Sequence, residues 1–371
     1  MTTPLEETIR RADAAGLALR KAIPKGPDQL LLELTDACGR LVAGQWRREP
    51  AQAADIADRL RAMYGPDSAT LLGAGVVIAH DGADRRLSSL HQQARRPGSR
   101  LLAHRAERRG VVRHADGSFV KVVRPSQVSQ LVASLIPADV AGLVFPTVTG
   151  VEAGAGCVRT AALPGRGLHE LLQDTELSDH EVDAALQQVG AAVAELHHTP
   201  AGRVLSTHGA QDELAVARGW LEAATEFGLL SPSCWTDGLR VARRLLSGQP
   251  STSVRLHRDL HDKQLLIASG APVGLLDLDL SAAGEPALDL ANLLTHLELR
   301  HLQGLVDQTR WQSAQAALLD GYRPGPSTLS RLPGYRQVAR LRLAAVYAFR
   351  TAEPDLVRAL LVPTPDKELI P

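Results

Sequence analysis

Cysteine is scarce in this sequence of 371 residues. The three cysteines, Cys38, Cys157 and Cys234, lie far apart and form neither a C-x-x-C zinc pattern nor a disulfide framework. No apolar run approaches the ~18 residues that a membrane helix needs, and the amino terminus lacks the basic-then-apolar pattern of a secretion signal. These absences predict a cytoplasmic protein without membrane attachment, whose stability comes from its apolar core.

The sequence also lacks an excess of charge of either sign and has few aromatic residues. Forty-one basic residues balance forty-one acidic ones, and aromatic residues make up 3% of the chain. Arginines are dense between Arg85 and Arg113, but acidic residues alternate with them, so we expect no nucleic-acid partner. The low aromatic content leaves few platforms on which a sugar could stack.

Two segments late in the chain concentrate histidine, aspartate and amide side chains. Residues 256–264 read Leu-His-Arg-Asp-Leu-His-Asp-Lys-Gln, and residues 276–280 read Leu-Asp-Leu-Asp-Leu. A His-x-Asp turn offers the Asp259 carboxylate to orient and deprotonate a hydroxyl. The amide of Gln264 and the carboxylate of Asp277 offer oxygen ligands to a hard cation. This combination predicts a centre for phosphoryl transfer.

The spacing of the two segments predicts that they meet. Short apolar runs at 265–267 and 273–276 flank the turn-rich residues 268–272, a pattern typical of a β-hairpin. Such a hairpin would carry Gln264 and Asp277 to the same cleft.

Together with residues 284–291, Gly-Glu-Pro-Ala-Leu-Asp-Leu-Ala, these segments resemble the aminoglycoside phosphotransferase and choline-kinase-like family of the protein-kinase-like fold. The catalytic loop of that family reads His-Gly-Asp-Leu-His-x-x-Asn. The resemblance implies that Asp259 is the catalytic carboxylate, that Asp277 holds Mg²⁺ and that Asp289 braces the catalytic loop. Two positions depart from the pattern: Arg258 stands at the usual glycine, as in protein kinases, and Gln264 replaces the usual asparagine, as it also looks to do in bacterial maltokinases.

The upstream half contains a lysine of the kind that such a fold uses to reach nucleotide phosphates. Lys121 is one of only five lysines and lies in the apolar run 118–123, directly after an Asp-Gly turn signal. Its usual glutamate partner is not visible, because residues 125–135 contain no acidic side chain. Gln127, Gln130 and Glu152 are the alternatives.

The resemblance assigns the remaining site residues. Leu163 begins a Leu-Pro-Gly-x-x-Leu run that resembles the family's adenine-gripping linker, and we expect Leu163 and Arg258 to contact the nucleotide. Asp279 either joins a second metal ion or accepts hydrogen bonds from the catalytic loop. His257 and His261 are expected to support the site.

These features predict a bilobal α+β protein of the protein-kinase-like fold. Residues 1–70, in which the apolar spacing of 28–60 looks helical, are expected to form a helical extension that packs on the small lobe or forms a homodimer. Residues 71–162 are expected to form a β-rich small lobe that binds nucleotide. Residues 163–371 are expected to form a mainly helical large lobe that carries the catalytic residues and binds the acceptor.

The predicted activity is ATP- and Mg²⁺-dependent transfer of the γ-phosphoryl group to a hydroxyl of a small molecule, such as an aminoglycoside, a sugar or choline. A cationic antibiotic would need clustered carboxylates in the large lobe. Four acidic residues there are candidates: Glu213, Glu222, Glu226 and Asp237.

Two other functions remain open at this stage. One is a kinase for peptide or protein hydroxyls in natural-product tailoring, which the His-Arg-Asp triplet makes conceivable. The other is a nucleotide-binding pseudokinase with a regulatory or scaffolding role, suggested by Gln264, the missing helix glutamate and the absence of a glycine-rich loop.

Overall fold

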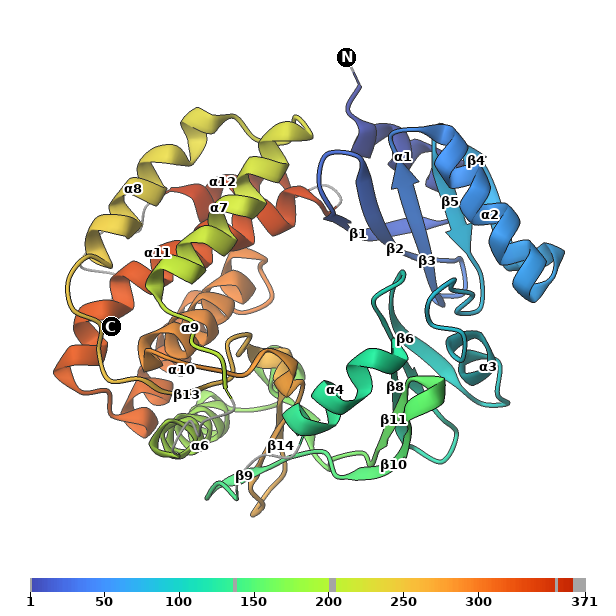
Figure 1. Ribbon diagram of the computed structural model, residues 1–371. Coiled ribbons are helices and arrows are strands. Elements are labelled where there is room, and N and C mark those ends of the chain that lie inside the picture. The colour runs from blue at the N-terminus through green and yellow to red at the C-terminus, as the bar shows by residue number, and fades with distance from the viewer. Residues whose placement is uncertain (1, 136–138, 200–204, 351–352, 363–371) are drawn as a thin grey trace.

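The computed structural model describes residues 2–135, 139–199, 205–350 and 353–362. Strands dominate the first half of the chain and helices dominate the second half (Figure 1), as the α+β prediction required. Among the described residues, no helix is both long enough and apolar enough to cross a membrane.

The first 79 residues form an antiparallel sheet with two helices. Its strands lie in the order β1-β2-β3-β5-β4. The elements are α1 (Pro4–Ala14), β1 (Ala18–Pro24), β2 (Gln29–Thr35), β3 (Leu41–Arg47), α2 (Pro50–Tyr64), β4 (Ala69–Gly73) and β5 (Val76–Ala79). We call these five strands the N-terminal sheet. Because β4 and β5 belong to it, the expected boundary at residue 70 falls inside the sheet.

The helical extension expected over residues 1–70 is therefore wrong in its central part. Strands β2 and β3 are buried on both faces, so their apolar residues run continuously and show no alternation that would separate strand from helix. The turn between them was the missed signal. Asp36 accepts hydrogen bonds from the amides of Cys38 and Arg40, and Gly39 has a φ of 72°.

The N-terminal sheet contacts both the large lobe and the sheet that follows it in the chain. Helix α2 covers one face through four buried apolar residues, Ala53, Ile56, Ala57 and Leu60. The other face joins the core of the large lobe, where the Trp46 and Phe227 rings lie 5.7 Å apart and the Ala22 amide donates to the Phe349 carbonyl at 2.9 Å. Strands β2 and β3 also contact β6 of the next sheet. Dimerisation through residues 1–70 stays a prediction.

The second sheet carries Lys121. Its strands lie in the order β10-β11-β8-β7-β6. The elements are α3 (Leu90–Ala94), β6 (Arg100–Arg105), β7 (Arg109–Arg113), β8 (Phe119–Val123), α4 (Val128–Leu135), β10 (Val148–Glu152) and β11 (Cys157–Thr160). The predicted strand around Lys121 is confirmed as β8, which pairs with β7 and β11.

The large lobe is helical, with short strands around residues 256–264. Its helices are α5 (Leu168–Gln173), α6 (Asp179–His198), α7 (Ala210–Glu226), α8 (Thr236–Leu245), α9 (Pro286–Leu302), α10 (Gln308–Tyr322), α11 (Pro326–Ala348) and α12 (Pro354–Leu361). The short strands are β9 (Leu143–Val144), β12 (Arg166–Gly167), β13 (Val254–Leu256), β14 (Leu265–Ile267), β15 (Val273–Leu275) and β16 (Ala282–Gly284). The predicted hairpin is confirmed, because β14 and β15 pair antiparallel.

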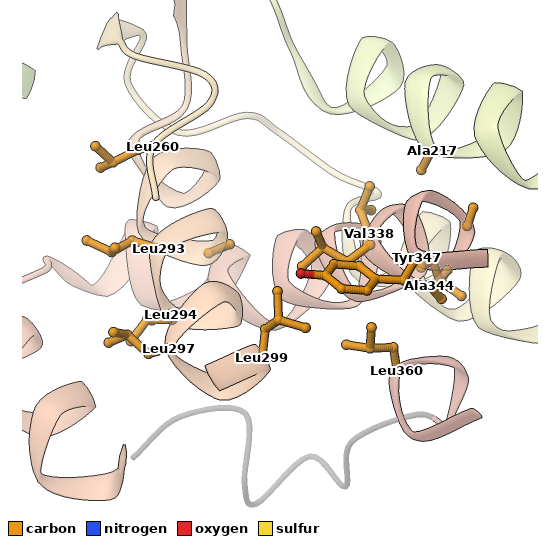
Figure 2. Packing of buried hydrophobic residues seen from close by; sticks show 14 of the residues in the cluster. Ala217, Leu260, Leu293, Leu294, Leu297, Leu299, Val338, Ala344, Tyr347 and Leu360 are labelled. Carbon is orange, nitrogen blue, oxygen red and sulfur yellow. The ribbon is translucent and has the colours of Figure 1, made fainter. Parts of the chain in front are cut away.

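Residues 256–264, which we call the catalytic segment after the prediction made for them, are anchored in the core of this lobe. Leu260 is fully buried and belongs to the same apolar cluster as Leu293 of α9 and Tyr347 of α11. Figure 2 shows Leu293 and Leu299 of α9 with Val338 and Tyr347 of α11 in this cluster. Asp259, whose carboxylate is expected to carry the chemistry, is therefore directly followed in the chain by a fixed, buried residue, Leu260.

Helices α6 and α10 approach each other closely enough that their backbones touch. A Cβ atom on Gly190 of α6 would lie 2.2 Å from the Leu318 carbonyl oxygen, and one on Gly321 of α10 would lie 2.1 Å from that of Gln187. Only glycine fits at such a contact. At the end of α6, His197 Nδ1 is 2.8 Å from the Tyr322 hydroxyl of α10.

Replacing Gly190 by alanine should destabilise the protein, because the added methyl group has only rigid backbone to displace. We expect the Gly190→Ala change to lower the free energy of unfolding by about 3 kcal/mol, measured by chemical denaturation. Gly219 is the matched control: it lies on α7 with nothing within 4 Å of an added Cβ. Gly219→Ala should stabilise by about 0.5–1 kcal/mol. Equal effects would contradict the close packing of α6 and α10.

Candidate active site

The Asp289 carboxylate organises the catalytic segment. Asp289 is fully buried in the first turn of α9. Its Oδ2 accepts from the His257 amide at 2.7 Å and its Oδ1 accepts from the Arg258 amide at 2.8 Å. His197 Nε2 lies 3.2 Å from Oδ2. Although burial opposes ionisation, these contacts hold the pKa of Asp289 below its usual range.

Arg258 is held from its other side as well. The Asn292 side chain donates from Nδ2 to the Arg258 carbonyl at 2.9 Å. Arg258 has a φ of 71°, in the left-handed region that glycine enters freely. This conformation gives a physical reason for the glycine that the His-Gly-Asp pattern of the resembled family has at this position. Arginine is accommodated here because both of its peptide groups are fixed by α9.

The side chain of Asp259 is presented outward from this rigid loop. The Asp259 amide donates to His257 Nδ1 at 3.2 Å, so the other His257 nitrogen, Nε2, carries the proton and donates to the Leu276 carbonyl at 2.8 Å. The Asp259 side chain is 39% exposed, and Arg342 Nη1 lies 4.0 Å from its Oδ1. Within the described residues its carboxylate accepts no hydrogen bond, which leaves it open to an acceptor hydroxyl.

Four charged side chains meet directly after β15, where the hydrogen bond from His257 to the Leu276 carbonyl joins the end of that strand to the loop of Asp259. Lys121 Nζ donates to Asp277 Oδ1 at 2.9 Å and to Asp279 Oδ2 at 2.6 Å. Arg109 donates to Asp279 Oδ2 at 3.0 Å and to Asp277 Oδ2 at 3.4 Å. Burial alone would raise the pKa of Asp277, but Lys121 and Arg109 hold it well below its usual range. We call these four residues the charge quartet.

The charge quartet identifies the acidic partners of Lys121. The sequence left Gln127, Gln130 and Glu152 open, and the structure pairs Lys121 with Asp277 and Asp279 instead. No residue of α4 is needed, because β8 delivers the lysine directly to the two carboxylates.

Arg109 was not among the site residues predicted from the sequence, although the pairing of its strand with the strand of Lys121 would have indicated it. Lys121 of β8 lies opposite Val111 of β7. Residues two apart on a strand share a face, so Arg109 lies on the same face of the sheet as Lys121. Such a cross-strand argument needs the register of the hairpin, which the sequence alone did not give.

The residues around Asp277 suit a hard cation. The Leu276 amide donates to the Gln264 carbonyl at 2.9 Å, which places Gln264 beside Asp277. Asp279 Oδ1 is buried and has no hydrogen-bond partner among the described residues. Carboxylate and amide oxygens are the donors that Mg²⁺ prefers. The donor set is therefore compatible with Mg²⁺.

The other predicted site residues lie at the edges of this centre. Leu163 follows β11 and is half-buried against Gly274, where the absence of a side chain leaves room for it. His261 stacks on His296 with ring centroids 4.8 Å apart. The contacts of Leu163 and His261 are thus internal, and their roles toward ligands stay predictions.

Asp262 forms a buried ionic contact directly after His261. It accepts from Arg300 Nε at 2.8 Å and Nη2 at 3.0 Å, and His169 Nδ1 lies 2.6 Å from its Oδ2. Although burial opposes ionisation, His169 and Arg300 hold the pKa of Asp262 far below its usual range. This contact joins the catalytic segment to α5 and α9.

The lowered pKa of Asp262 predicts acid sensitivity. Above about pH 4 the carboxylate is ionised in the folded and the unfolded chain. As the pH falls from there toward 2, only the unfolded chain takes up the proton, so the stability from Asp262 is lost. We expect the free energy of unfolding to fall less steeply over this range in Asp262→Asn than in the parent. Asp355→Asn, at a side chain that is 92% exposed, should keep the parent's slope; equal slopes in all three proteins would contradict this assignment.

Solved structures with a similar arrangement are phosphotransferases and kinases by name. The aminoglycoside phosphotransferase APH(3'')-Id from Streptomyces rimosus is 21% identical, with 69% of this chain and 97% of that chain covered and a TM-score of 0.49. A choline/ethanolamine kinase family protein from Mesorhizobium loti is 15% identical, with 72% and 90% covered and a TM-score of 0.49. A glucosamine kinase is 18% identical, with 93% and 92% covered and a TM-score of 0.45. These values are too low to bear on the substrate.

The sequence itself gives the family. Comparison with curated proteins finds no match. The model of the phosphotransferase enzyme family matches residues 128–335, which are more than half of the chain and include Asp259, Asp277 and Asp289. The chain therefore belongs to the phosphotransferase enzyme family.

Proposed function

We propose that this chain transfers the γ-phosphoryl group of ATP to a hydroxyl group of a small molecule. The observation that carries the proposal is a loop, fixed by Asp289, that presents the open Asp259 carboxylate and is hydrogen-bonded through His257 to Leu276, the residue directly before Asp277 of the charge quartet. Asp259 orients the acceptor hydroxyl and takes up its proton at the carboxylate. Fixing the loop through two backbone amides keeps that carboxylate in one place, which is how positioning contributes to catalysis.

The charge quartet supplies the groups that face the triphosphate. Gln264, Asp277 and Asp279 would hold Mg²⁺, which when bound neutralises charge on the phosphate oxygens. Lys121 and Arg109 then donate to phosphate oxygens in place of their present carboxylate partners. Leu163 and Arg258 are proposed to contact the nucleotide, and His257 and His261 to support the loop.

One observation favours a second candidate, a nucleotide-binding regulatory module without turnover. Lys121 and Arg109 already bind the carboxylates that would hold the metal, and Gln264 stands in place of the family's asparagine. A site in which these ion pairs persist would bind nucleotide without completing the metal site. Turnover measurements separate the two candidates.

The direct test compares Asp259→Asn, Asp277→Asn and the parent in Mg²⁺-dependent ADP release over a panel of hydroxylated acceptors. Asp259→Asn should lower acceptor-dependent turnover by about 10²–10⁴-fold while nucleotide binding persists, because only the proton acceptor is lost. Asp277→Asn should also weaken the binding of Mg²⁺ and ATP. Asp355→Asn, at a side chain that is 92% exposed, is the control and should match the parent.

The possible outcomes distinguish the candidates. Nucleotide-induced thermal stabilisation without ADP release from any acceptor would favour the regulatory module. A parent protein that neither binds nor hydrolyses ATP would contradict both candidates.

Arg109 offers an independent test of the phosphate contact. Arg109→Gln should weaken ATP binding about tenfold, equivalent to the loss of about 1.5 kcal/mol of charge-assisted hydrogen bonding. Arg113→Gln removes the same charge from an exposed position of the same strand and should leave ATP binding unchanged. Isothermal titration with ATP and Mg²⁺ measures both. Equal affinities for the two variants would place Arg109 outside the nucleotide site.

A further inference from the structure

Arg342, on α11, lies close to the candidate catalytic carboxylate. Its Nη1 atom is 4.0 Å from Asp259 Oδ1, a separation too long for a hydrogen bond. Within the described residues, Nη1 donates no hydrogen bond. The Arg342 side chain is 16% exposed and the Asp259 side chain is 39% exposed. The two groups therefore face each other where a ligand can reach both.

The other two nitrogens of the Arg342 guanidinium are held by α9 and α7. Nη2 donates to Asn292 Oδ1 of α9 at 2.9 Å. Nε lies 3.3 Å from Glu213 Oε1 of α7. Because a guanidinium is planar and rigid, contacts on two of its nitrogens also fix the third. Nη1 therefore keeps its place beside Asp259.

Asn292 joins Arg342 to the catalytic segment. Both ends of its buried amide are used: Nδ2 donates to the Arg258 carbonyl at 2.9 Å, and Oδ1 accepts from Arg342. Arg258 directly precedes Asp259 in the chain. One side chain thus holds both the loop that presents the carboxylate and the arginine that faces it. The distance between Nη1 and the Asp259 carboxylate is set by this shared support.

Glu213, which was expected to help bind a cationic acceptor, holds Arg342 instead. It is buried, and His208 Nε2 lies 2.9 Å from its Oε2. Although burial opposes ionisation, His208 and Arg342 hold the pKa of Glu213 below its usual range. A ligand that meets Asp259 beside α11 therefore meets the N–H donors of Arg342 in place of this carboxylate.

Arg342 approaches Asp259 from the helical part of the large lobe. Figure 1 shows α7 and α11 on the left of the molecule and β8 on the right. Lys121 of β8 binds Asp277, which is proposed to face the triphosphate. The donors proposed for the nucleotide and the Nη1 donor of Arg342 thus come from different parts of the structure. This placement suits Arg342 to the acceptor.

We propose that Arg342 binds the acceptor and selects a vicinal diol: Asp259 accepts the hydrogen of the reacting hydroxyl, while Arg342 Nη1 donates to the oxygen on the neighbouring carbon. This inference rests on the proposed phosphotransferase function. Two neighbouring oxygens of one ligand can span the 4.0 Å between Nη1 and Oδ1, each at hydrogen-bond distance from its partner. An ammonium group in place of the second oxygen has only donors and leaves Nη1 without an acceptor.

The diol is held while its reacting hydroxyl is phosphorylated. The acceptor oxygen forms a bond to the γ-phosphorus, the bond from that phosphorus to the β,γ-bridging oxygen breaks, ADP leaves with that electron pair, and the hydroxyl proton passes to Asp259. Arg342 keeps its own protons, because a guanidinium is not deprotonated in proteins. By fixing the second oxygen, Arg342 limits the positions that the reacting oxygen can take.

The test compares diols with amino alcohols in which an ammonium group replaces one hydroxyl. The pairs are glycerol with 2-amino-1,3-propanediol, trans-1,2-cyclohexanediol with trans-2-aminocyclohexanol, and glucose with glucosamine. ADP release is measured with Mg²⁺ and ATP at about pH 6, where the amines are protonated. The kcat/KM of the parent should be higher for the diol by about tenfold or more, because the amino alcohol leaves a charged donor unpaired.

Two variants separate the contact of Arg342 with the acceptor from its contacts inside the protein. Arg342→Gln should lower kcat/KM for the diol and reduce the preference to about threefold or less, because glutamine has an oxygen that can accept from an ammonium group. Arg342→Lys should also lower kcat/KM for the diol but keep the preference, since lysine is again only a donor. The control Arg358→Gln removes an arginine with a 75% exposed side chain and should match the parent.

The parent by itself can contradict the proposal, whether or not the variants fold. A preference for the amino alcohols, or equal kcat/KM within each pair, would overturn it, as would a parent that binds ATP but releases ADP with none of the three diols. Equal losses for both members of a pair in Arg342→Gln would show a purely structural role and overturn it too. A parent that shows no thermal stabilisation by ATP and Mg²⁺ would reject the phosphotransferase function itself.

Discussion

The buried carboxylate of Asp289 is the interaction on which the candidate site depends. It accepts the amide hydrogens of two successive residues, His257 and Arg258, and so fixes the path of the chain directly before Asp259. Its own position is set by α9 and by His197, which α6 delivers through its close contact with α10. A charge removed from water in this way is stable only when it is fully paired. The position of the Asp259 carboxylate therefore depends on how α6, α9 and α10 pack, at some distance from Asp259 itself.

Much of the catalytic half was predictable from sequence because its signals are local. The hairpin β14–β15 and the placement of Lys121 on β8 followed from short apolar runs and turn residues. The position of Asp289 could be proposed because it occurs in a motif with a fixed distance from the loop. The ligand roles proposed for these residues rest on family resemblance and geometry.

The parts that were not predictable depend on partners distant in the chain. Arg109 contacts Asp279 across 170 positions, and Arg300 contacts Asp262 across 38. The N-terminal sheet was mistaken for helix because β2 and β3 are buried on both faces, which removes the alternation that distinguishes a strand. The large lobe, which lies more than a hundred residues later in the chain, covers the second face of these strands. No pattern in the local sequence predicts that contact.

The position of the N-terminal sheet also has a mechanical consequence. The chain connects the second sheet with the large lobe on both sides of β9, which pairs with β15, and again through residues 161–165 between β11 and β12. The N-terminal sheet adds a noncovalent connection, since β1 is bonded to Phe349 and β2 and β3 touch β6. The two lobes and the sheet thus form a closed ring (Figure 1). A hinge at residues 161–165 cannot open freely without shearing one of these interfaces, so the lobes can separate only by small sliding movements or by transient release of the sheet.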